Sequence, residues 1–453
     1  MNIVIAGASG YIGRALIPIL RSRYPEARIT ALSRSPRTSG DPQIDWRVCD
    51  LFSLLEIENS LPDRIDVAYY LVHSMLPTAH LDQGSFADYD LILADNFARA
   101  LKLKNGKRLI YLSGLISDVD HLSPHLRSRR EVEQIFKAHK LDTTTFRAGL
   151  VVGPHGSSFE ILVRLVKRLP VMLCPTWTQT LTTPIDLLSV VSILARSATA
   201  PSDIGRTYDL AGSQPLTYMD MMMETARWLG LKRRLFQAPF FTPWLSRLWV
   251  SLITGQSKAL LYPLIESLRF DMVPRVGHLY DPPPTKSYGD ILREMPKIPQ
   301  ENSHSTAYTP KKLRVRSVQR LPLPKGMSAK DVREEYVRWL PGFFRPFIRV
   351  WCEGDHVAFS LISKRFTLLS LHFSAERSTL DRQLLYIEGG LLAGKESRGR
   401  FEFRAVLDGR FILAAIHEYN PALPWYIYQW TQAKAHLFVM KAFGRHLTSR
   451  DAI

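Results

Sequence analysis

Residues 3–13 read IVIAGASGYIG, a short apolar run followed by three glycines with the spacing Gly-x-x-Gly-x-x-Gly. The apolar run predicts a buried strand, and residues 14–23 continue as an amphipathic helix. A glycine-rich turn between a strand and a helix brings backbone N–H groups and the helix N-terminus against a pyrophosphate. The stretch therefore predicts a dinucleotide-binding turn, with a tight strand-to-helix turn of no further function as the alternative.

The same rhythm continues along the first third of the chain. Short apolar runs alternate with amphipathic stretches of helical period, which indicates a parallel sheet with crossover helices. The predicted strands are residues 3–6, 29–32, 68–72, 108–112 and 144–147. We expect an α/β fold, a Rossmann-type doubly wound sheet, over residues 1–280, with a mostly helical extension after residue 150.

A second domain is expected after a linker. Residues 281–312 are rich in proline and polar side chains, which is typical of a linker. Residues 313–453 contain strand-like runs with turn residues between them and close with a helical pattern from Pro424 to Leu447. Residues 401–405 alternate apolar and charged side chains, as in a sheet with one face toward water. We predict an α+β domain in which an antiparallel sheet grips a long C-terminal helix.

Composition excludes several classes of protein. The chain has 453 residues, of which 46% are hydrophobic and 22% charged, so it is neither a collagen-like repeat nor a largely disordered polymer. Cys49, Cys174 and Cys352 form no Cys-x-x-Cys pair, which argues against a disulfide framework or a zinc knuckle. With no basic leader and no apolar run of about 20 residues, we expect a cytoplasmic protein without a spanning helix.

The net charge of +17 is concentrated toward the end of the chain, where residues 301–453 carry 24 Lys and Arg against 14 Asp and Glu. Such an excess attracts an anionic partner, although it also suits an ordinary solvated surface. No motif typical of nucleic-acid binding accompanies it, so we expect no nucleic-acid partner. Peripheral contact with the inner face of a membrane stays open.

The end of the second predicted strand distinguishes NADP from NAD. An NAD site usually presents an acidic side chain here to the ribose hydroxyl, but this chain reads Ser33-Arg34-Ser35-Pro36-Arg37. A guanidinium suits a 2′-phosphate, so Arg34 and Arg37 favour NADP as the cofactor and make NAD less favoured. The alternative is that both arginines are ordinary loop charges.

With these motifs, the first 275 residues or so resemble the short-chain dehydrogenase/reductase superfamily, in its extended and atypical branches of the NAD-dependent epimerase/dehydratase kind. The resemblance implies that Asp50 and Leu51 meet the adenine, that residues 71–73 run beside the cofactor, and that Ser113 occupies the place of the catalytic serine. Together, the predicted cofactor-binding residues are Gly7, Ser9, Gly10, Tyr11, Ile12, Gly13, Ser33, Arg34, Arg37, Asp50, Leu51, Leu71, Val72 and His73.

The usual catalytic pair of that superfamily is missing. Its members pair a Tyr with a Lys one helical turn later, whereas the Tyr-x-x-x-Lys of this chain, Tyr308 to Lys312, lies in the predicted linker and is split by a proline. His125 stands in the Tyr place and Arg129 in the Lys place. We predict Ser113, His125 and Arg129 as catalytic candidates, with cofactor binding or helix capping as the alternative for the last two. No metal site is expected.

Residues 313–453 resemble a bacterial domain of unknown function that accompanies the atypical branch, and by analogy helix-grip folds that enclose an apolar ligand. Three functions remain open. The first is an NADP-dependent reductase or isomerase acting on a small hydrophobic molecule such as a quinone or isoprenoid. The second is a non-catalytic nucleotide-binding protein, similar to complex I accessory subunits. The third is a lipid-binding adaptor at the membrane. The sequence predicts neither the substrate nor the oligomeric state.

Overall fold

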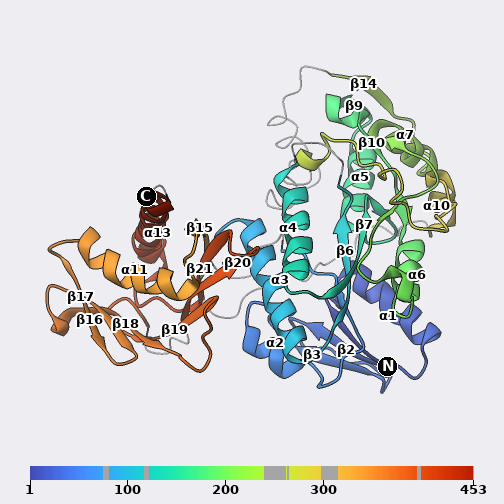
Figure 1. The fold of residues 1–453 in the computed structure, drawn as a ribbon. Coiled ribbons are helices and arrows are strands. Elements are labelled where there is room, and N and C mark those ends of the chain that lie inside the picture. The colour runs from blue at the N-terminus through green and yellow to red at the C-terminus, as the bar shows by residue number, and fades with distance from the viewer. Residues whose placement is uncertain are drawn as a thin grey trace. The chain divides into compact units, whose positions relative to one another are not determined.

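The computed structural model describes residues 1–74, 81–116, 122–238, 262, 265–296, 315–394 and 399–451. The chain forms two compact units (Figure 1). The N-terminal unit comprises Met1–Leu76 and Asp90–Ser305, and the C-terminal unit comprises Pro77–Tyr89 and Thr306–Ile453. A short segment from the first third of the chain thus belongs to the C-terminal unit, which the predicted domain of residues 1–280 did not anticipate.

The N-terminal unit is built on a seven-stranded parallel sheet with the order β12-β7-β6-β4-β1-β2-β3. The strands are β1 (Asn2–Ala6), β2 (Arg28–Ser33), β3 (Ile44–Val48), β4 (Val67–Tyr70), β6 (Arg108–Gly114), β7 (Asp142–Ala148) and β12 (Thr207–Leu210). The strand order reverses between β1 and β4, so the crevice at their carboxyl ends is a topological switch point. The predicted doubly wound sheet is confirmed, and β12 is one of its edge strands.

Helices cover both faces of this sheet (Figure 1). On one face, α1 (Tyr11–Arg23) and α6 (Leu187–Ser197) bury most of their leucines and isoleucines in a core with β1 and β2. On the other, the rings of Phe97 of α3 (Phe86–Leu103) and Phe136 of α4 (Pro124–Ala138) pack at an angle or edge-on against Tyr70 and Tyr111 of the sheet. Helix α2 (Leu54–Ser60) follows β3. Because both faces are covered, the central strands consist of nearly continuous apolar residues.

The predicted helical extension contains α5 (Ser157–Arg168) and α7 (Tyr218–Trp228), which share a second apolar core with α10 (Tyr288–Glu294). Small two-stranded ladders connect them: β8 (Val151–Val152) with β11 (Ile185–Asp186), β9 (Val171–Cys174) with β14 (Arg234–Gln237), and β10 (Leu181–Thr182) with β13 (Leu216–Thr217). Two 3-10 turns complete it, η1 (Thr176–Gln179) and η2 (Pro201–Asp203).

Helix α10 corrects part of the predicted linker at residues 281–312. Ser287 and Asp290 form a capping box at its start, and the side chains of Ile291 and Leu292 are buried in the second core. Proline-rich segments flank this helix of about two turns, so the sequence pattern did not reveal it. Residues 297–312 of the predicted linker, which include Tyr308 and Lys312, lie outside the described residues.

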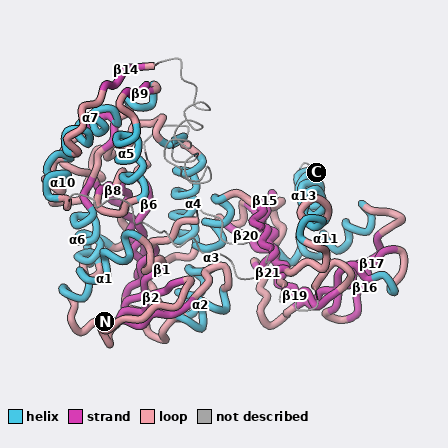
Figure 2. Tube along the Cα trace, turned by 180° about the vertical axis from the view of Figure 1, so that it is seen from behind, coloured by secondary structure: helices cyan, strands magenta, loops and turns pink. Residues whose placement is uncertain are grey.

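The C-terminal unit is a sheet with the order β16-β17-β18-β19-β20-β21-β15-β5, antiparallel except for the β15–β5 pair. Its strands are β5 (Leu81–Gln83), β15 (Val315–Pro322), β16 (Ile348–Glu353), β17 (His356–Leu361), β18 (Thr367–Phe373), β19 (Arg382–Gly389), β20 (Arg400–Val406) and β21 (Phe411–Tyr419), with η3 (Lys364–Phe366) between β17 and β18. Helices α11 (Ala329–Phe343) and α13 (Gln432–Asp451) lie on the same face (Figure 2). The predicted α+β domain is confirmed.

Two details of that domain differ from expectation. The helical pattern at residues 424–447 is divided into α12 (Trp425–Tyr428) and α13, and α11 and β16 were not predicted. The charged side chains of residues 401–405 do not face water, because Glu402 is 2% and Arg404 1% exposed. They pair with each other, and Glu402 also binds Arg382 at 2.9 Å, which satisfies the buried charges.

Among the described residues, no helix combines the length and apolar character needed to cross a membrane.

Candidate functional site

The glycine-rich turn has a backbone that other residues would not fit. Gly7 has a φ of +86°, and a Cβ added to it would lie 2.7 Å from the carbonyl oxygen of Leu71. A Cβ added to Gly13 would lie 2.4 Å from the carbonyl oxygen of Gly7. The N–H of Gly10 donates to that same carbonyl oxygen at 2.9 Å and closes the turn. Glycine is therefore required here for close approach of the chain to itself.

The turn ends at the N-terminus of α1, where the backbone donors point to the same crevice. Gly10 is the N-cap, no side chain caps the helix, and its first turn has no acidic residue. The first N–H groups of a helix lack intrahelical partners and carry partial positive charge, so they suit a pyrophosphate. Ser9, Tyr11 and Ile12 lie at this turn and are half-buried. The cradle formed by the glycines thus fits a dinucleotide.

Two neighbouring strand ends carry the residues predicted to hold the adenosine part. Ser33 is buried at the end of β2, while Arg34 and Arg37 follow it and are exposed, with the Arg37 guanidinium 5.6 Å from the centre of the Trp46 ring.

At the end of β3, the Asp50 carboxylate accepts a hydrogen bond from the N–H of Phe52 at 3.1 Å. The carbonyl of Leu51 accepts one from the side-chain amide of Asn96 at 2.9 Å, so α3 fixes this loop. The parallel register of β1, β2 and β3 places both loops at the carboxyl edge of the sheet.

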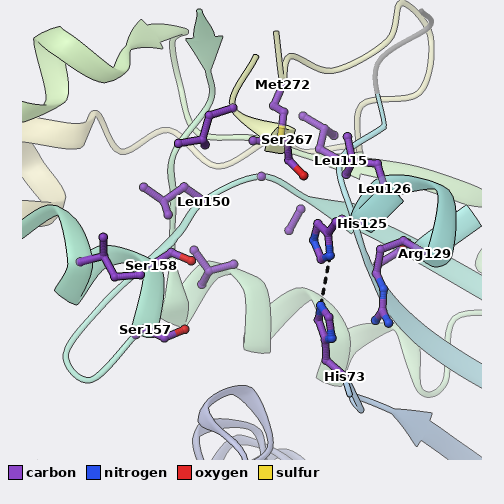
Figure 3. A pocket seen from close by; sticks show the side chains of 18 of the residues that line it. His73, Leu115, His125, Leu126, Arg129, Leu150, Ser157, Ser158, Ser267 and Met272 are labelled. Atoms are coloured by element: carbon purple, nitrogen blue, oxygen red, sulfur yellow. Dashed lines mark hydrogen bonds between the residues drawn. The ribbon is translucent and has the colours of Figure 1, made fainter. Parts of the chain in front are cut away.

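A cavity of about 380 Å³ lies beside the glycine turn, at the carboxyl ends of β4, β6 and β7 (Figure 3). Its walls are mainly apolar and come from the sheet, from α4 and α5, and from residues 265–272. The apolar lining includes Leu112, Leu115, Leu126, Leu150, Ile161, Leu162, Leu165, Trp177, Ile265, Leu268 and Met272. Leu71 and Val72, which were predicted to run beside the cofactor, also line it. A pocket of this size and character is typical of a small-molecule site.

Two histidines face each other inside the cavity. The Nε2 of His73 lies 3.3 Å from the Nδ1 of His125, and the two rings stack with centroids 5.0 Å apart and planes at 8° (Figure 3). Burial and then the positive charge of Arg129 lower the pKa of His125 to about 4 and hold that of His73 well below its ordinary value. Both imidazoles are therefore neutral near pH 7, and one ring donates to the other.

Arg129 is turned to a buried carboxylate. Its guanidinium forms an ion pair with Asp90 of α3 and donates to the carbonyl of Val72 at 3.3 Å. Asp90 also accepts hydrogen bonds from the backbone and hydroxyl of Ser74 and from the hydroxyl of Ser128, at 2.8 to 3.0 Å. Because these contacts join the loop of His73 to the helix of His125, the geometry supports a positioning role for Arg129, and the catalytic role predicted for it stays a prediction.

Ser113 ends β6 and lines the cavity. Its hydroxyl is buried and makes no hydrogen bond of ordinary geometry with any described residue. A buried hydroxyl without a partner costs free energy unless a ligand or water pairs with it. Ser113 is thus placed to bind a polar atom of a bound molecule.

The structure brings the candidates Ser113 and His125 to one cavity, together with the glycine turn. Asp90 was not predicted from the sequence, and His73 was predicted to contact the cofactor but not to neighbour His125. An aspartate on the buried face of an amphipathic helix was the available signal for Asp90, since such a charge needs a partner. The cavity wall at residues 265–272 carried no recognisable motif.

Comparisons with known proteins agree with this architecture. Residues 3–170, less than half of the chain, match the model of the NAD dependent epimerase/dehydratase family. Auxiliary protein GraX of Staphylococcus aureus (strain NCTC 8325 / PS 47) is 31% identical over 115 residues, which cover 25% of this chain and 36% of that protein. The matched segment thus spans about a third of this curated relative.

Solved structures share the fold at low identity. A nucleoside-diphosphate-sugar epimerase from Staphylococcus aureus superposes with a TM-score of 0.53 at 12% identity, covering 65% of this chain and 100% of its own. A triphenylmethane reductase from Citrobacter sp. gives a TM-score of 0.52 at 14% identity, covering 65% of this chain and 98% of its own. At these identities the likeness is one of fold.

Proposed function

From the premise that residues 3–170 form a domain of the NAD dependent epimerase/dehydratase family, we propose that the protein is an NADP(H)-dependent reductase of a hydrophobic molecule with a carbonyl or quinone group. The observation that carries the proposal is the apolar cavity that holds the His73–His125 pair and the buried hydroxyl of Ser113 beside the glycine turn. A reductase needs this combination, because the substrate body must be buried while its oxygen meets hydrogen-bond donors.

The cofactor assignment rests on the ends of β1 and β2. The glycine turn and the N-terminus of α1 would hold the pyrophosphate, and Arg34 and Arg37 would hold the 2′-phosphate. A triphenylmethane reductase of similar fold has been solved with NADP(H), which supports the choice of this cofactor. When bound, the reduced nicotinamide supplies a hydride.

The chain's own residues would orient the substrate and handle its proton. The apolar walls hold the hydrophobic body and exclude water. Ser113 Oγ and the Nε2 of His125 donate hydrogen bonds to the substrate oxygen, as neutral imidazoles do when a lowered pKa keeps them uncharged. His73, hydrogen-bonded to the Nδ1 of His125, passes a proton to that ring from solvent. Arg129 holds both histidines in place through Asp90.

A second candidate is a non-catalytic nucleotide-binding protein. It is favoured by one observation, the absence of the Tyr-x-x-x-Lys pair at residues 125–129. The two candidates differ in whether NADPH is consumed, so purified protein is tested with NADPH and hydrophobic quinones and aldehydes while the NADPH absorbance is followed. Turnover supports the reductase, and tight NADPH binding without turnover supports the second candidate.

Cofactor preference is tested with an Arg34→Ala/Arg37→Ala variant. We expect its affinity for NADPH to fall about 10- to 100-fold, because a hydrogen bond to a charged group contributes about 1.5–3 kcal/mol. The affinity for NADH, which lacks the 2′-phosphate, should change less than about twofold. Calorimetric titration measures both constants. Arg28→Ala is the matched control, since Arg28 is exposed at the opposite end of β2. Equal losses for NADPH and NADH would refute the assignment.

A further inference from the structure

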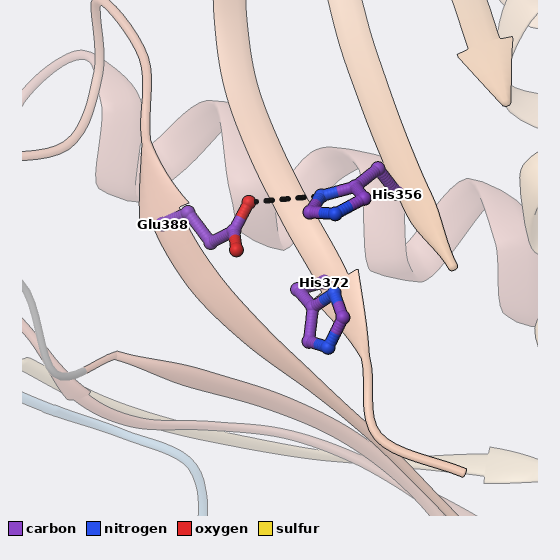
Figure 4. Close-up of side chains that lie close together, drawn as sticks. All are labelled: His356, His372 and Glu388. Atoms are coloured by element: carbon purple, nitrogen blue, oxygen red, sulfur yellow. Dashed lines mark hydrogen bonds and ion pairs between the residues drawn. The ribbon is translucent and has the colours of Figure 1, made fainter. Parts of the chain in front are cut away.

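Three side chains with metal-binding atoms lie together on the sheet of the C-terminal unit. His356 is in β17, His372 in β18 and Glu388 in β19, three neighbouring strands (Figure 4). The register pairs His356 directly with His372. Residues opposite each other on adjacent antiparallel strands have Cβ atoms about 4.5–5.5 Å apart, so the sheet itself holds the two imidazoles together.

The distances suit a small cation. One nitrogen of each imidazole and one oxygen of Glu388 all lie within 4.8 Å of one another. The Nδ1 of His356 is 3.1 Å from the Glu388 carboxylate, and the two ring centroids are 4.7 Å apart. Tetrahedral zinc, with ligand bonds of about 2.0–2.2 Å, needs ligand atoms about 3.3 Å apart. Small side-chain rotations therefore suffice to close the site.

One atom of the cluster is left unsatisfied. The Nδ1 of His372 is buried and has no hydrogen-bond partner among the described residues. A buried ring nitrogen without a partner raises the free energy of the folded state, and a metal ion bound to the Nδ1 of His372 would give it a partner. His356 and Glu388 are 54% and 43% exposed, so an ion can reach them from solvent.

We propose that the C-terminal unit binds one zinc ion through His356, His372 and Glu388, with a water molecule as the fourth ligand. Two imidazoles and a carboxylate are a ligand set that zinc accepts, and three protein ligands leave one position open. The ion would join three strands near the β16 edge of the sheet and stabilise the unit by mass action. These three residues come from three strands and form no short motif, so the sequence does not reveal them as a set.

The test is zinc titration of the tag-free full-length chain by calorimetry, with bound metal counted by elemental analysis. We expect one zinc per chain, and His372→Ala and Glu388→Gln should each weaken binding by about tenfold or more. His155→Ala is the matched control, since His155 is exposed and has one carboxylate neighbour, Glu160, at 3.8 Å. Glu388→Gln keeps the shape of the side chain, so a loss of zinc affinity in this variant would not result from misfolding. Absence of stoichiometric binding, or equal losses in the control, would overturn the proposal.

A separate apolar surface supports a second, independent inference. At one end of the C-terminal unit, Phe347 is 59%, Ile362 56% and Phe366 53% exposed. The N–H of Ile362 donates to the carbonyl of Phe347 at 2.9 Å, which joins the α11–β16 connection to the β17–β18 connection. Ile362 also has a φ of +62°, a strained conformation for a β-branched residue. We name Phe347, Ile362 and Phe366 the apolar tip.

The two chain segments that carry the apolar tip are basic. Residues 341–350 and 361–366 contain Arg345, Arg349, Lys364 and Arg365 and no Asp or Glu. All four cations are exposed, and Lys364 pairs with Glu353 of the neighbouring strand. Exposed aromatic and aliphatic side chains surrounded by Lys and Arg are the pattern of a surface that enters the interface of an anionic bilayer. We infer that the apolar tip docks the protein on an anionic lipid surface.

Sedimentation with vesicles of phosphatidylglycerol and phosphatidylcholine tests this. We expect the full chain to bind, with binding that weakens as salt is added. Phe347→Ser/Ile362→Ser should reduce the bound fraction about tenfold, since each removes a large apolar side chain from the interface. Phe236→Ser, at an exposed position of the N-terminal unit, is the control. Failure to bind vesicles would refute the lipid surface as the occupant of the apolar tip. Self-association, measured by light scattering and abolished in the double variant, would also refute it and would indicate that a second copy of the chain covers the tip.

Discussion

Replacing Arg129 with methionine is expected to lower the free energy of unfolding of the N-terminal unit by about 3–5 kcal/mol. Arg129 is 3% and Asp90 1% exposed, and the two form an ion pair. Removing the guanidinium leaves a buried carboxylate with hydrogen bonds from serines but without a cation. The loop that carries His73 would also lose its tie to α4, since Arg129 donates to the Val72 carbonyl.

Urea denaturation at about pH 7 measures this effect. The control is Arg64→Met, which removes a guanidinium that is 82% exposed and paired with Asp66 at 3.2 Å, and should cost less than about 1 kcal/mol. An Asp90→Leu/Arg129→Met double variant should recover part of the loss, because no unpaired charge remains. If Arg129→Met costs no more than Arg64→Met, the positioning role assigned to Arg129 is wrong.

The same ion pair has a pH signature. Burial is the largest influence and would raise the pKa of Asp90, but the Arg129 guanidinium, His73 and the hydrogen bonds to the carboxylate together outweigh it, and the pKa is lowered to about 2. A carboxyl group whose pKa is lower in the folded than in the unfolded state adds stability above its unfolded pKa of about 3.9, and this is lost as the pH falls toward the folded value. The stability that Asp90 adds to the wild type should therefore be complete at about pH 7 and shrink between about pH 4 and pH 2. In Arg129→Met burial raises the pKa of Asp90, so the deficit of this variant should begin to shrink at a pH above about 4.

The sequence predicted those parts of the fold that depend on local signals. The turn at Gly7 needs a positive φ and close contact, which only glycine allows, and the central strands are apolar because both of their faces are covered. The location of the end of β2 was equally predictable, because a parallel strand followed by a loop must end at the carboxyl edge of the sheet. These features require no knowledge of distant residues.

Features that depend on pairing between distant residues were not predictable in the same way. Arg129 was assigned by its position relative to a motif, but its partner Asp90 lies 39 positions away on another helix. Glu402 and Arg404 alternate with apolar residues, which indicated a solvent-facing side, yet they are buried because they neutralise each other. The zinc ligands proposed here come from three strands whose register alone makes them neighbours. In each case the residues that pair with a side chain lie elsewhere in the fold, so the local sequence pattern does not reveal them.

Replacing His125 with phenylalanine is expected to reduce turnover about 10²- to 10³-fold while the dissociation constant of NADPH changes less than about twofold. Phenylalanine keeps a planar ring that can stack on His73, but it has no nitrogen to bind the substrate oxygen or to receive a proton. Stopped-flow kinetics with saturating NADPH separates the two effects, and His278→Ala is a control because that ring contacts the Thr207 carbonyl near the edge strand β12. Unchanged turnover in His125→Phe would exclude His125 as the hydrogen-bond donor.

The pH profile of the wild type distinguishes a neutral donor from a protonated one. With its pKa lowered to about 4, His125 stays uncharged down to about pH 5, so turnover should be nearly constant between about pH 8 and pH 5 and fall only as the pH approaches 4. A protonated histidine of ordinary pKa would instead give activity that rises as the pH falls through about 6.5. A rise of that kind would show that substrate binding restores the charge of the ring, and that His125 acts as a general acid in place of a neutral donor.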